Sequence, residues 1–395
     1  MSDEEVRPFP LSIPERDLAD LRERLDRVRW PDRETVTDVS QGPSLAKMMA
    51  LVDRWRGGYD WRRAEALLNG WGQYTTMIDG LDISFLHVRS PEAAARPLIM
   101  THGWPGSVLE FRHVIGPLTD PAAHGGDPAD AFHLVLPTLP GFGFSERPSM
   151  PGWDLGRTAE AWITLMDRLG YDEYFAEGGD LGAGVTDEMA AREPAGLKGI
   201  HLTFAMFAPT PEERAEATAD EQKMLDSADY FWTDLSGYAK EQSTRPQTIG
   251  YSLADSPVGL AAWIYAMFQD TGGTPGNAEG SFAVDEMLDD IMLYWLPNTG
   301  TSAARMYWEM AQAKWSSPAT LEHPVKLPAG LCMSPAEHVR KSRRWTERRY
   351  PNLVRFTELA EGGHFTAWEQ PAAFVEDVRA TFRATLSSGG PEWSR

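Results

Sequence analysis

A glycine-rich stretch, Gly178-Gly179-Asp180-Leu181-Gly182, follows a strand-like run and precedes a helix-like one. This spacing is typical of a nucleophile elbow, a sharp turn in which small residues let one side chain project above a sheet. An aspartate carboxylate is ionised near neutral pH, and it can displace at a strained or activated sp3 carbon to form an ester. The motif alone leaves two interpretations open: Asp180 is a nucleophile, or it caps the helix after a glycine-rich turn.

A second motif, His102-Gly103-Trp104-Pro105, directly follows the strand-like run that ends at Thr101. A loop in this place supplies a backbone N–H, here that of Trp104, to an oxyanion hole completed by the N–H of Leu181. These donors would stabilise the tetrahedral oxyanion formed when water attacks an ester of Asp180. We expect His102 to orient the loop rather than to carry a proton, and the bond before Pro105 is a candidate for the cis form.

A histidine in the stretch Glu361-Gly362-Gly363-His364-Phe365 follows the last strand-like run. The chain order nucleophile, acid, histidine is that of α/β-hydrolases, so His364 is the expected general base. Glu337 follows the penultimate strand-like run and is the expected acid that fixes the imidazole tautomer. The other position for this acid, after the run at residues 198–204, offers no carboxylate. A surface glutamate is the competing interpretation of Glu337.

Tyrosines between residues 206 and 318 are candidates for the acid that a strained ring oxygen, such as that of an epoxide, needs as it opens. A tyrosine hydroxyl donates a hydrogen bond and then a proton to a developing alkoxide. Spacing alone does not select among the candidates, and a buried aromatic with a satisfied hydroxyl is the alternative for each of them. They are Tyr230, Tyr238, Tyr251, Tyr265, Tyr294 and Tyr307.

The segments that must position these residues alternate between strand-like and helix-like patterns, which predicts a mostly parallel α/β sheet. The strand-like runs are 96–103, 132–141, 173–179, 198–204, 327–335 and 352–359. Residues 206–318 form a Trp- and Tyr-rich helical pattern without clear strands, which indicates an inserted cap over the carboxyl ends of the strands. We therefore expect core segments at 93–205 and 319–395, with the cap at 206–318 between them.

Residues 1–92 precede this pattern, and we expect them to form an N-terminal extension. Leu18, Leu21, Leu25 and Val28 recur at helical spacing between charged residues, which predicts an amphipathic helix over residues 14–29. A second short helix is predicted at 59–71, and the alternation over 78–88 around a glycine-containing turn predicts a hairpin.

The composition excludes several classes of partner. Lys and Arg number 37 against 58 Asp and Glu, a net charge of −21 that repels nucleic acid phosphates and anionic membranes. The start of the chain lacks a basic leader and a signal-length apolar run, so we expect a soluble, cytoplasmic protein. The single cysteine, Cys332, allows no intramolecular disulfide and fits a reducing compartment. We expect no cofactor and no metal, and homodimer formation is left open.

Together these stretches resemble the microsomal-type epoxide hydrolase family over nearly the whole chain. The similarity lies in residues 20–32, 58–71 and 78–90 of the extension, 101–107, 136–145, 178–182 and 362–365 of the core, and 242–263 of the cap. The resemblance implies an α/β-hydrolase fold with a helical cap and a wrapping N-terminal extension. It also implies cofactor-independent conversion of an epoxide to a vicinal diol through an ester of Asp180, with Glu337 as acid and His364 as base. The two ring-opening tyrosines of the family fall on Tyr238 and Tyr307.

Two departures from the family pattern stand out. Leu181 replaces a tryptophan next to the nucleophile, and Ser84 replaces a histidine. Leu181 alters a pocket wall rather than the donor N–H, so the departure bears on substrate selectivity. The resemblance to soluble bacterial members implies an aryl or bulky epoxide, met in natural-product biosynthesis or detoxification.

Two alternative functions are compatible with the same motifs. A haloalkane dehalogenase shares the Asp-His-acid set, but it needs halide-binding donors, which the Leu181 side chain does not supply. A non-catalytic binding protein of hydrolase fold is the other alternative. It is disfavoured because every expected catalytic position holds a competent residue.

Overall fold

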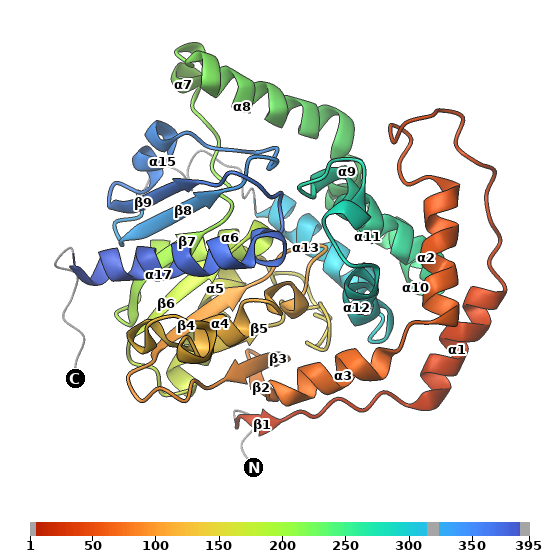
Figure 1. Cartoon of the computed structure of the whole chain (residues 1–395), viewed down its shortest axis with the longest axis horizontal. Coiled ribbons are helices and arrows are strands. Elements are labelled where there is room, and N and C mark those ends of the chain that lie inside the picture. Colours follow the sequence, from red (N-terminus) through yellow and green to blue (C-terminus); the bar gives the residue numbers. More distant parts are fainter. Residues whose placement is uncertain (1–4, 314–323, 388–395) are drawn as a thin grey trace.

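A nine-stranded sheet forms the centre of the part of the chain described by this computed structural model, residues 5–313 and 324–387 (Figure 1). The strand order is β1-β2-β3-β5-β4-β6-β7-β8-β9. The first three strands pair antiparallel, and the other six run parallel to one another, which confirms the predicted mostly parallel sheet. The bounds are β1 Arg7–Pro8, β2 Gln73–Ile78, β3 Leu81–Val88, β4 Arg96–Thr101, β5 Phe132–Pro137, β6 Tyr174–Gly178, β7 Leu197–Leu202, β8 Ala329–Met333 and β9 Leu353–Glu358.

Helices cover both faces of the parallel strands, and all residues of β6 and β8 are buried as a result. Helix α6 (Asp180–Ala191) contacts β4, β6 and β7, and α5 (Leu155–Arg168) packs beside it. Helix α17 (Pro371–Ser387) contacts β7, β8 and β9 on the other face (Figure 1). Short helices α4 (Ile115–Thr119), α15 (Arg343–Arg349) and α16 (Thr366–Glu369) complete the core.

A run of helices stands between β7 and β8 in the sequence, in the region where the helical pattern predicted a cap. The helices are α7 Pro211–Ala215, α8 Ala219–Tyr230, α9 Gly237–Thr244, α10 Pro246–Asp255, α11 Pro257–Thr271, α12 Val284–Trp295 and α13 Gly300–Gln312. Figure 1 shows α11, α12 and α13 between the sheet and the N-terminal helices. The expected division of the chain at 92, 205 and 318 stays a prediction, and its boundary at 318 and 319 lies outside the described residues.

The N-terminal region contributes helices α1 (Glu15–Asp26), α2 (Leu45–Gly57) and α3 (Trp61–Gly70) and the hairpin β2–β3, which joins the sheet. The amphipathic pattern is confirmed, because Leu18, Leu21 and Leu25 of α1 are buried. Helices α1 and α2 contact α11, while α2 and α3 contact α12. The N-terminal region therefore packs against the helices of residues 257–295 as well as against the sheet.

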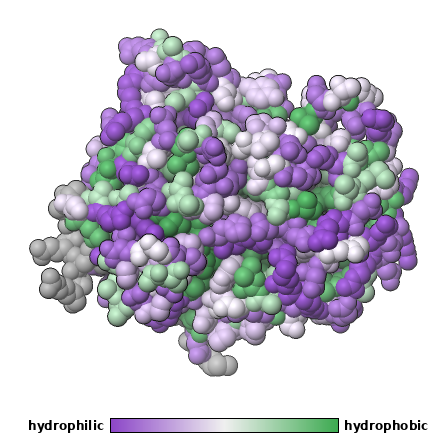
Figure 2. All heavy atoms as spheres, viewed as in Figure 1, coloured by the Kyte–Doolittle hydropathy of each residue, from purple (hydrophilic) through white to green (hydrophobic). Residues whose placement is uncertain are grey.

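The face shown in Figure 2 is dominated by hydrophilic residues, with hydrophobic residues scattered among them. Within the described ranges, the structure contains no helix that is both long and apolar enough to cross a bilayer.

Candidate active site

Asp180 lies at the junction of β6 and α6 with a positive φ of 48°, a backbone conformation that non-glycine residues rarely adopt. Two glycines make this turn sterically feasible. A Cβ on Gly178 would lie 2.2 Å from the Gly182 carbonyl oxygen, and a Cβ on Gly182 would lie 1.8 Å from that of Thr101. The turn places the Asp180 carboxylate at the amino end of a twelve-residue helix, where the helix dipole favours negative charge.

The loop after β4 contacts this carboxylate directly. The backbone N–H of Trp104 donates a 2.9 Å hydrogen bond to Asp180 Oδ1, and the Trp104-Pro105 bond is cis. A Cβ on Gly103 would lie 2.3 Å from the Asp180 Cβ, so the close approach needs glycine. His102 holds the loop, because its Nε2 accepts the Leu139 N–H at 3.2 Å. Burial lowers the pKa of His102 to about 4, which keeps the ring neutral.

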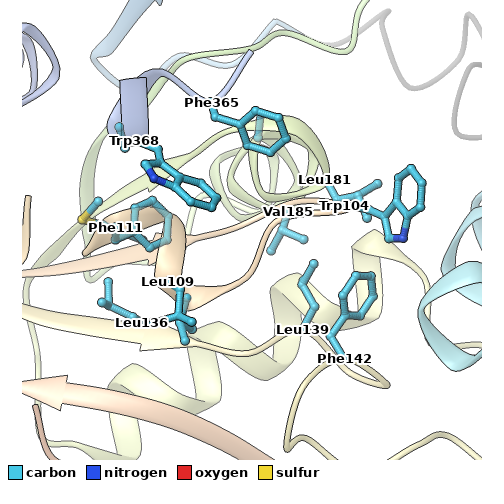
Figure 3. Packing of buried hydrophobic residues seen from close by; sticks show 14 of the residues in the cluster. Trp104, Leu109, Phe111, Leu136, Leu139, Phe142, Leu181, Val185, Phe365 and Trp368 are labelled. Carbon is cyan, nitrogen blue, oxygen red and sulfur yellow. The ribbon is translucent and has the colours of Figure 1, made fainter. Parts of the chain in front are cut away.

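Leu181 is the second predicted oxyanion donor, and its side chain is buried at 1% exposure. Its amide belongs to the first turn of α6, where N–H groups have no partner within the helix. Among the described residues, this amide makes no hydrogen bond to Asp180, so its role stays a prediction. Figure 3 shows the Leu181 side chain beside Trp104 and Val185, within the packed hydrophobic residues of the core.

His364 and Glu337 complete a continuous line of charged groups. His364 Nε2 lies 3.4 Å from Asp180 Oδ2, and His364 Nδ1 lies 2.6 Å from Glu337 Oε2. Glu337 Oε1 accepts the Val339 N–H at 2.8 Å, which fixes the carboxylate. Burial opposes a charged imidazole, but the Glu337 and Asp180 carboxylates outweigh it and raise the pKa of His364 well above its ordinary value. Burial likewise opposes a charged Glu337, but the pKa of this carboxyl is lowered because His364 and the Val339 amide stabilise its anion.

The loop that carries His364 is held by groups that sequence reasoning missed. Glu369 Oε1 accepts the N–H groups of Gly363 and Phe365 at 3.2 and 3.1 Å. The N–H of His364 donates to the Thr271 carbonyl oxygen at the end of α11, at 2.9 Å. No pattern in the sequence distinguishes Glu369 from a surface glutamate, because its partners are backbone amides of a neighbouring loop.

Tyr238 on α9 and Tyr307 on α13 both contact the Trp104 ring. Tyr238 stacks on it at a centroid distance of 4.7 Å, and Tyr307 meets it edge to face at 5.9 Å. The two tyrosines lie 5.9 Å from each other, ring to ring. Burial raises the pKa of Tyr238, and the Asp180 charge adds to this. Burial also raises the pKa of Tyr307, with further contributions from Tyr238 and Asp180, so both groups remain protonated donors.

The other candidate tyrosines are engaged or placed elsewhere. Tyr294 donates to the Gly106 carbonyl oxygen at 2.7 Å, and Tyr265 donates to Glu279 at 2.8 Å. Tyr230 and Tyr251 are 52% and 71% exposed. Of the six tyrosines, the pair named by the family resemblance packs on the Trp104 ring, and the Trp104 amide binds Asp180; their role in ring opening stays a prediction.

In the described part of the chain, one group of potential metal ligands is buried, with its ligand atoms within 4.8 Å of one another: His201 on β7, Cys332 on β8 and Asp377 on α17. Asp377 already accepts hydrogen bonds from Arg355 at 2.5 Å and Thr357 at 2.6 Å, and it pairs with His201 at 3.1 Å. Since a guanidinium already balances this carboxylate, the donor set does not favour a metal ion.

The fold and the site together define an α/β-hydrolase with an aspartate at the nucleophile position. Two family profiles match the chain: one described as "Epoxide hydrolase N terminus" at residues 6–111, and one described as "alpha/beta hydrolase fold" at residues 96–236.

Individual proteins are similar over almost the full length. A protein of Stigmatella aurantiaca named "Putative epoxide hydrolase" is 50% identical over 96% of this chain and 85% of its own length. Epoxide hydrolase 1 of Sus scrofa is 33% identical over 95% of this chain and 88% of its own. The crystal structure of the juvenile hormone epoxide hydrolase of Bombyx mori superposes with a TM-score of 0.90 at 26% identity, covering 98% and 96% of the two chains. The chain belongs to the epoxide hydrolase family.

Proposed function

We propose that this protein hydrolyses an epoxide to a vicinal diol through a covalent ester of Asp180. The observation that supports the proposal is that Asp180 lies close both to a histidine and to a loop on which two tyrosines pack. On one side His364 Nε2 lies 3.4 Å from its carboxylate, and on the other the Tyr238 and Tyr307 rings pack on Trp104, whose amide binds the same carboxylate.

In the first step Asp180 Oδ2 attacks one epoxide carbon, and the bond from that carbon to the ring oxygen breaks. Tyr238 and Tyr307 hold the ring oxygen, and one of them gives it a proton. The raised pKa values of both groups fit a donor that stays protonated until an alkoxide forms. The imidazolium of His364 then returns a proton to the tyrosinate, which leaves a neutral imidazole beside the new ester.

In the second step neutral His364 takes a proton from water as the water oxygen attacks the carbonyl carbon of the ester. The electrons of the carbonyl bond move to Oδ1, where the Trp104 N–H donates, and the Leu181 N–H is the proposed second donor. The intermediate collapses and expels the diol alkoxide. The new carboxylic acid of Asp180 gives its proton to that alkoxide, which restores the carboxylate and the imidazolium.

The tyrosine pair favours an epoxide over a haloalkane as substrate. A hydroxyl that donates a proton suits a leaving oxygen, whereas a departing halide needs only a hydrogen bond. The Leu181 side chain provides no such bond. The aromatic walls formed by Trp104, Tyr238 and Tyr307 suit an aryl or bulky epoxide. We extend the proposal to a cytoplasmic enzyme of detoxification or natural-product biosynthesis that needs no cofactor.

The test combines substrate profiling with isotope labelling. Aryl and aliphatic epoxides are assayed for diol formation, and haloalkanes for halide release. A single turnover in H₂¹⁸O with excess enzyme should give unlabelled diol and place ¹⁸O on Asp180, because the oxygen added to the substrate comes from the carboxylate. Label in the diol of the first turnover would show direct attack by water and exclude the ester.

A further inference from the structure

The loop that carries Glu337, residues 334–342 between β8 and α15, contains a buried lysine. Lys341 is 3% exposed, whereas lysines are almost never fully buried unless their charge is paired. Among the described residues Lys341 forms no ion pair, and the one hydrogen bond of its amine runs from Nζ to the Val339 carbonyl oxygen at 3.2 Å. The burial of this charge beside the catalytic loop therefore calls for a functional explanation.

Val339 joins the lysine to Glu337. Its N–H donates to Glu337 Oε1 at 2.8 Å, while its carbonyl oxygen accepts the hydrogen bond from Lys341. Because a single residue separates these two contacts, the amine nitrogen and the carboxylate oxygen lie at most about 10 Å apart. Both side chains are buried, so solvent and salt screen their attraction only weakly.

Lys341 carries its positive charge at neutral pH. Burial lowers the pKa of its amine to about 8, and the Glu337 carboxylate opposes this effect. The Phe207 ring lies under the amine, with 5.6 Å between Nζ and the ring centroid, and an aromatic face at this distance attracts a cation. The ammonium group is thus held on the loop that fixes Glu337.

In the resting site the protonated His364 balances the Glu337 carboxylate, but the imidazole is neutral once the ester has formed. Glu337 is then a buried anion beside an uncharged ring. We propose that Lys341 is a positioning residue that keeps Glu337 ionised during ester hydrolysis, and so keeps the proton of neutral His364 on Nδ1. Nε2 is then free to take a proton from water. The inference rests on the proposed ester mechanism and adds what maintains the relay acid in its second step.

Loss of the lysine charge would act on both partners in the same direction. The pKa of Glu337 would rise, because burial disfavours its anion, and the pKa of His364 would rise because a nearby cation has gone. Either change means that ester hydrolysis needs a higher pH. At an effective dielectric constant of about 20, a charge about 10 Å away changes a pKa by about 1, and a shorter distance changes it more.

Other titratable and charged groups surround this loop and His364, and a Lys341 variant leaves all of them in place. Around the loop they are His338 and Arg340 of the loop itself, Arg344 and Arg348 of α15 with their ion-pair partners Glu221 and Glu213, and Asp270 of α11, whose carbonyl oxygen lies 3.0 Å from His338 Nε2. Glu110 and Glu369 act on His364, and burial raises the pKa of both carboxyls. A shifted pH profile in the variant therefore reports on the lysine.

The experiment measures ester formation and ester hydrolysis separately, by rapid-quench single turnovers over a range of pH, in the wild type and in variants of Lys341. Lys341→Met removes the charge and the hydrogen bond, Lys341→Gln keeps a donor for the Val339 carbonyl oxygen without the charge, and Lys341→Arg keeps both.

In the methionine and glutamine variants, the pH at which hydrolysis reaches half its maximum rate should rise by at least about 1. The maximum itself should return at high pH, because Glu337 ionises and His364 is neutral there. Alkylation should stay within about twofold of wild type, since His364 balances Glu337 in that step. Lys341→Arg should keep the wild-type profile.

Lys198→Met is the matched control. The Lys198 side chain is only 12% exposed and pairs with Glu173 at 3.1 Å, but it lies at the start of β7, the end of the sheet opposite to the catalytic residues. Its loss should leave both half-reactions and their pH profiles unchanged.

Three results would overturn the role of the lysine charge: hydrolysis slowed equally at every pH, a glutamine variant with the wild-type profile, or an arginine variant shifted as far as the methionine one. If Lys341→Met does not fold, Lys341→Gln carries the same test, because it also lacks the charge. A wild type that forms no ester on Asp180 would instead refute the proposed function.

Discussion

Replacing Tyr238 and Tyr307 by phenylalanine removes the two hydroxyls that the proposed mechanism places on the epoxide oxygen. Tyr307 is buried and Tyr238 is half-buried, and burial raises the pKa of both hydroxyls. A hydrogen bond to a charged group contributes about 1.5–3 kcal/mol, which corresponds to about 10- to 150-fold in rate. Each single variant should therefore slow alkylation of Asp180 by about that factor. The double variant should slow it beyond either single one, by about 1,000-fold or more.

The assay is single-turnover alkylation measured by intact mass spectrometry of quenched samples. Tyr251→Phe is the control, because this tyrosine is 71% exposed and its hydroxyl lies outside the site. Hydrolysis of an ester already formed should change much less than alkylation in the double variant. A double variant that alkylates at the wild-type rate would refute the assignment of both tyrosines, and a loss equal to that of Tyr251→Phe would do the same.

Three further changes test other parts of the structure. His364→Gln should still alkylate but hydrolyse at least about 100-fold more slowly, so mass spectrometry should find a substrate-sized adduct on Asp180; an adduct elsewhere contradicts the assignment. Asp289→Ala removes a fully buried carboxylate that pairs with Arg112 at 2.9 Å, and urea titration should show that the free energy of unfolding falls by about 3–5 kcal/mol. A fall below about 1 kcal/mol would contradict the stabilising role of this buried pair. Burial disfavours a charged His201, but the Asp377 carboxylate outweighs burial and raises the pKa of His201 well above its ordinary value. The stability that this pair contributes is therefore present below about pH 6.5 and is lost as the pH rises through the raised pKa. His201→Asn should therefore cost more melting temperature at pH 6 than at pH 10, and an equal cost at both would contradict this.

The parts of the fold that the sequence predicted best are those with a strong local pattern. The hairpin is an example: Asp79 and Gly80 both have positive φ, as a two-residue turn of this kind requires, and β2 and β3 flank them. Its first strand extends back to Gln73, beyond the predicted start, because the polar residues of that strand hid its alternation. Helix α2 was not predicted, although Met48 and Leu51 recur at helical spacing and are buried.

The site residues also differ in how well the sequence predicted their positions. Asp180, Glu337 and His364 follow strands β6, β8 and β9 of one parallel sheet, so topology alone brings them to a common edge. Tyr238 and Tyr307 sit on two different helices whose placement depends on side-chain packing, and only the family resemblance selected them from six candidates. Glu369 carried no signal at all, because its partners are backbone amides of a neighbouring loop.

The charges of the site explain how one histidine can serve both half-reactions. In the resting site, Asp180 and Glu337 together hold His364 protonated against the cost of burial. Ester formation removes the Asp180 charge and leaves Glu337 alone against the same burial, so the pKa of His364 must fall at that moment. The imidazole thus becomes a competent base only after the nucleophile has reacted.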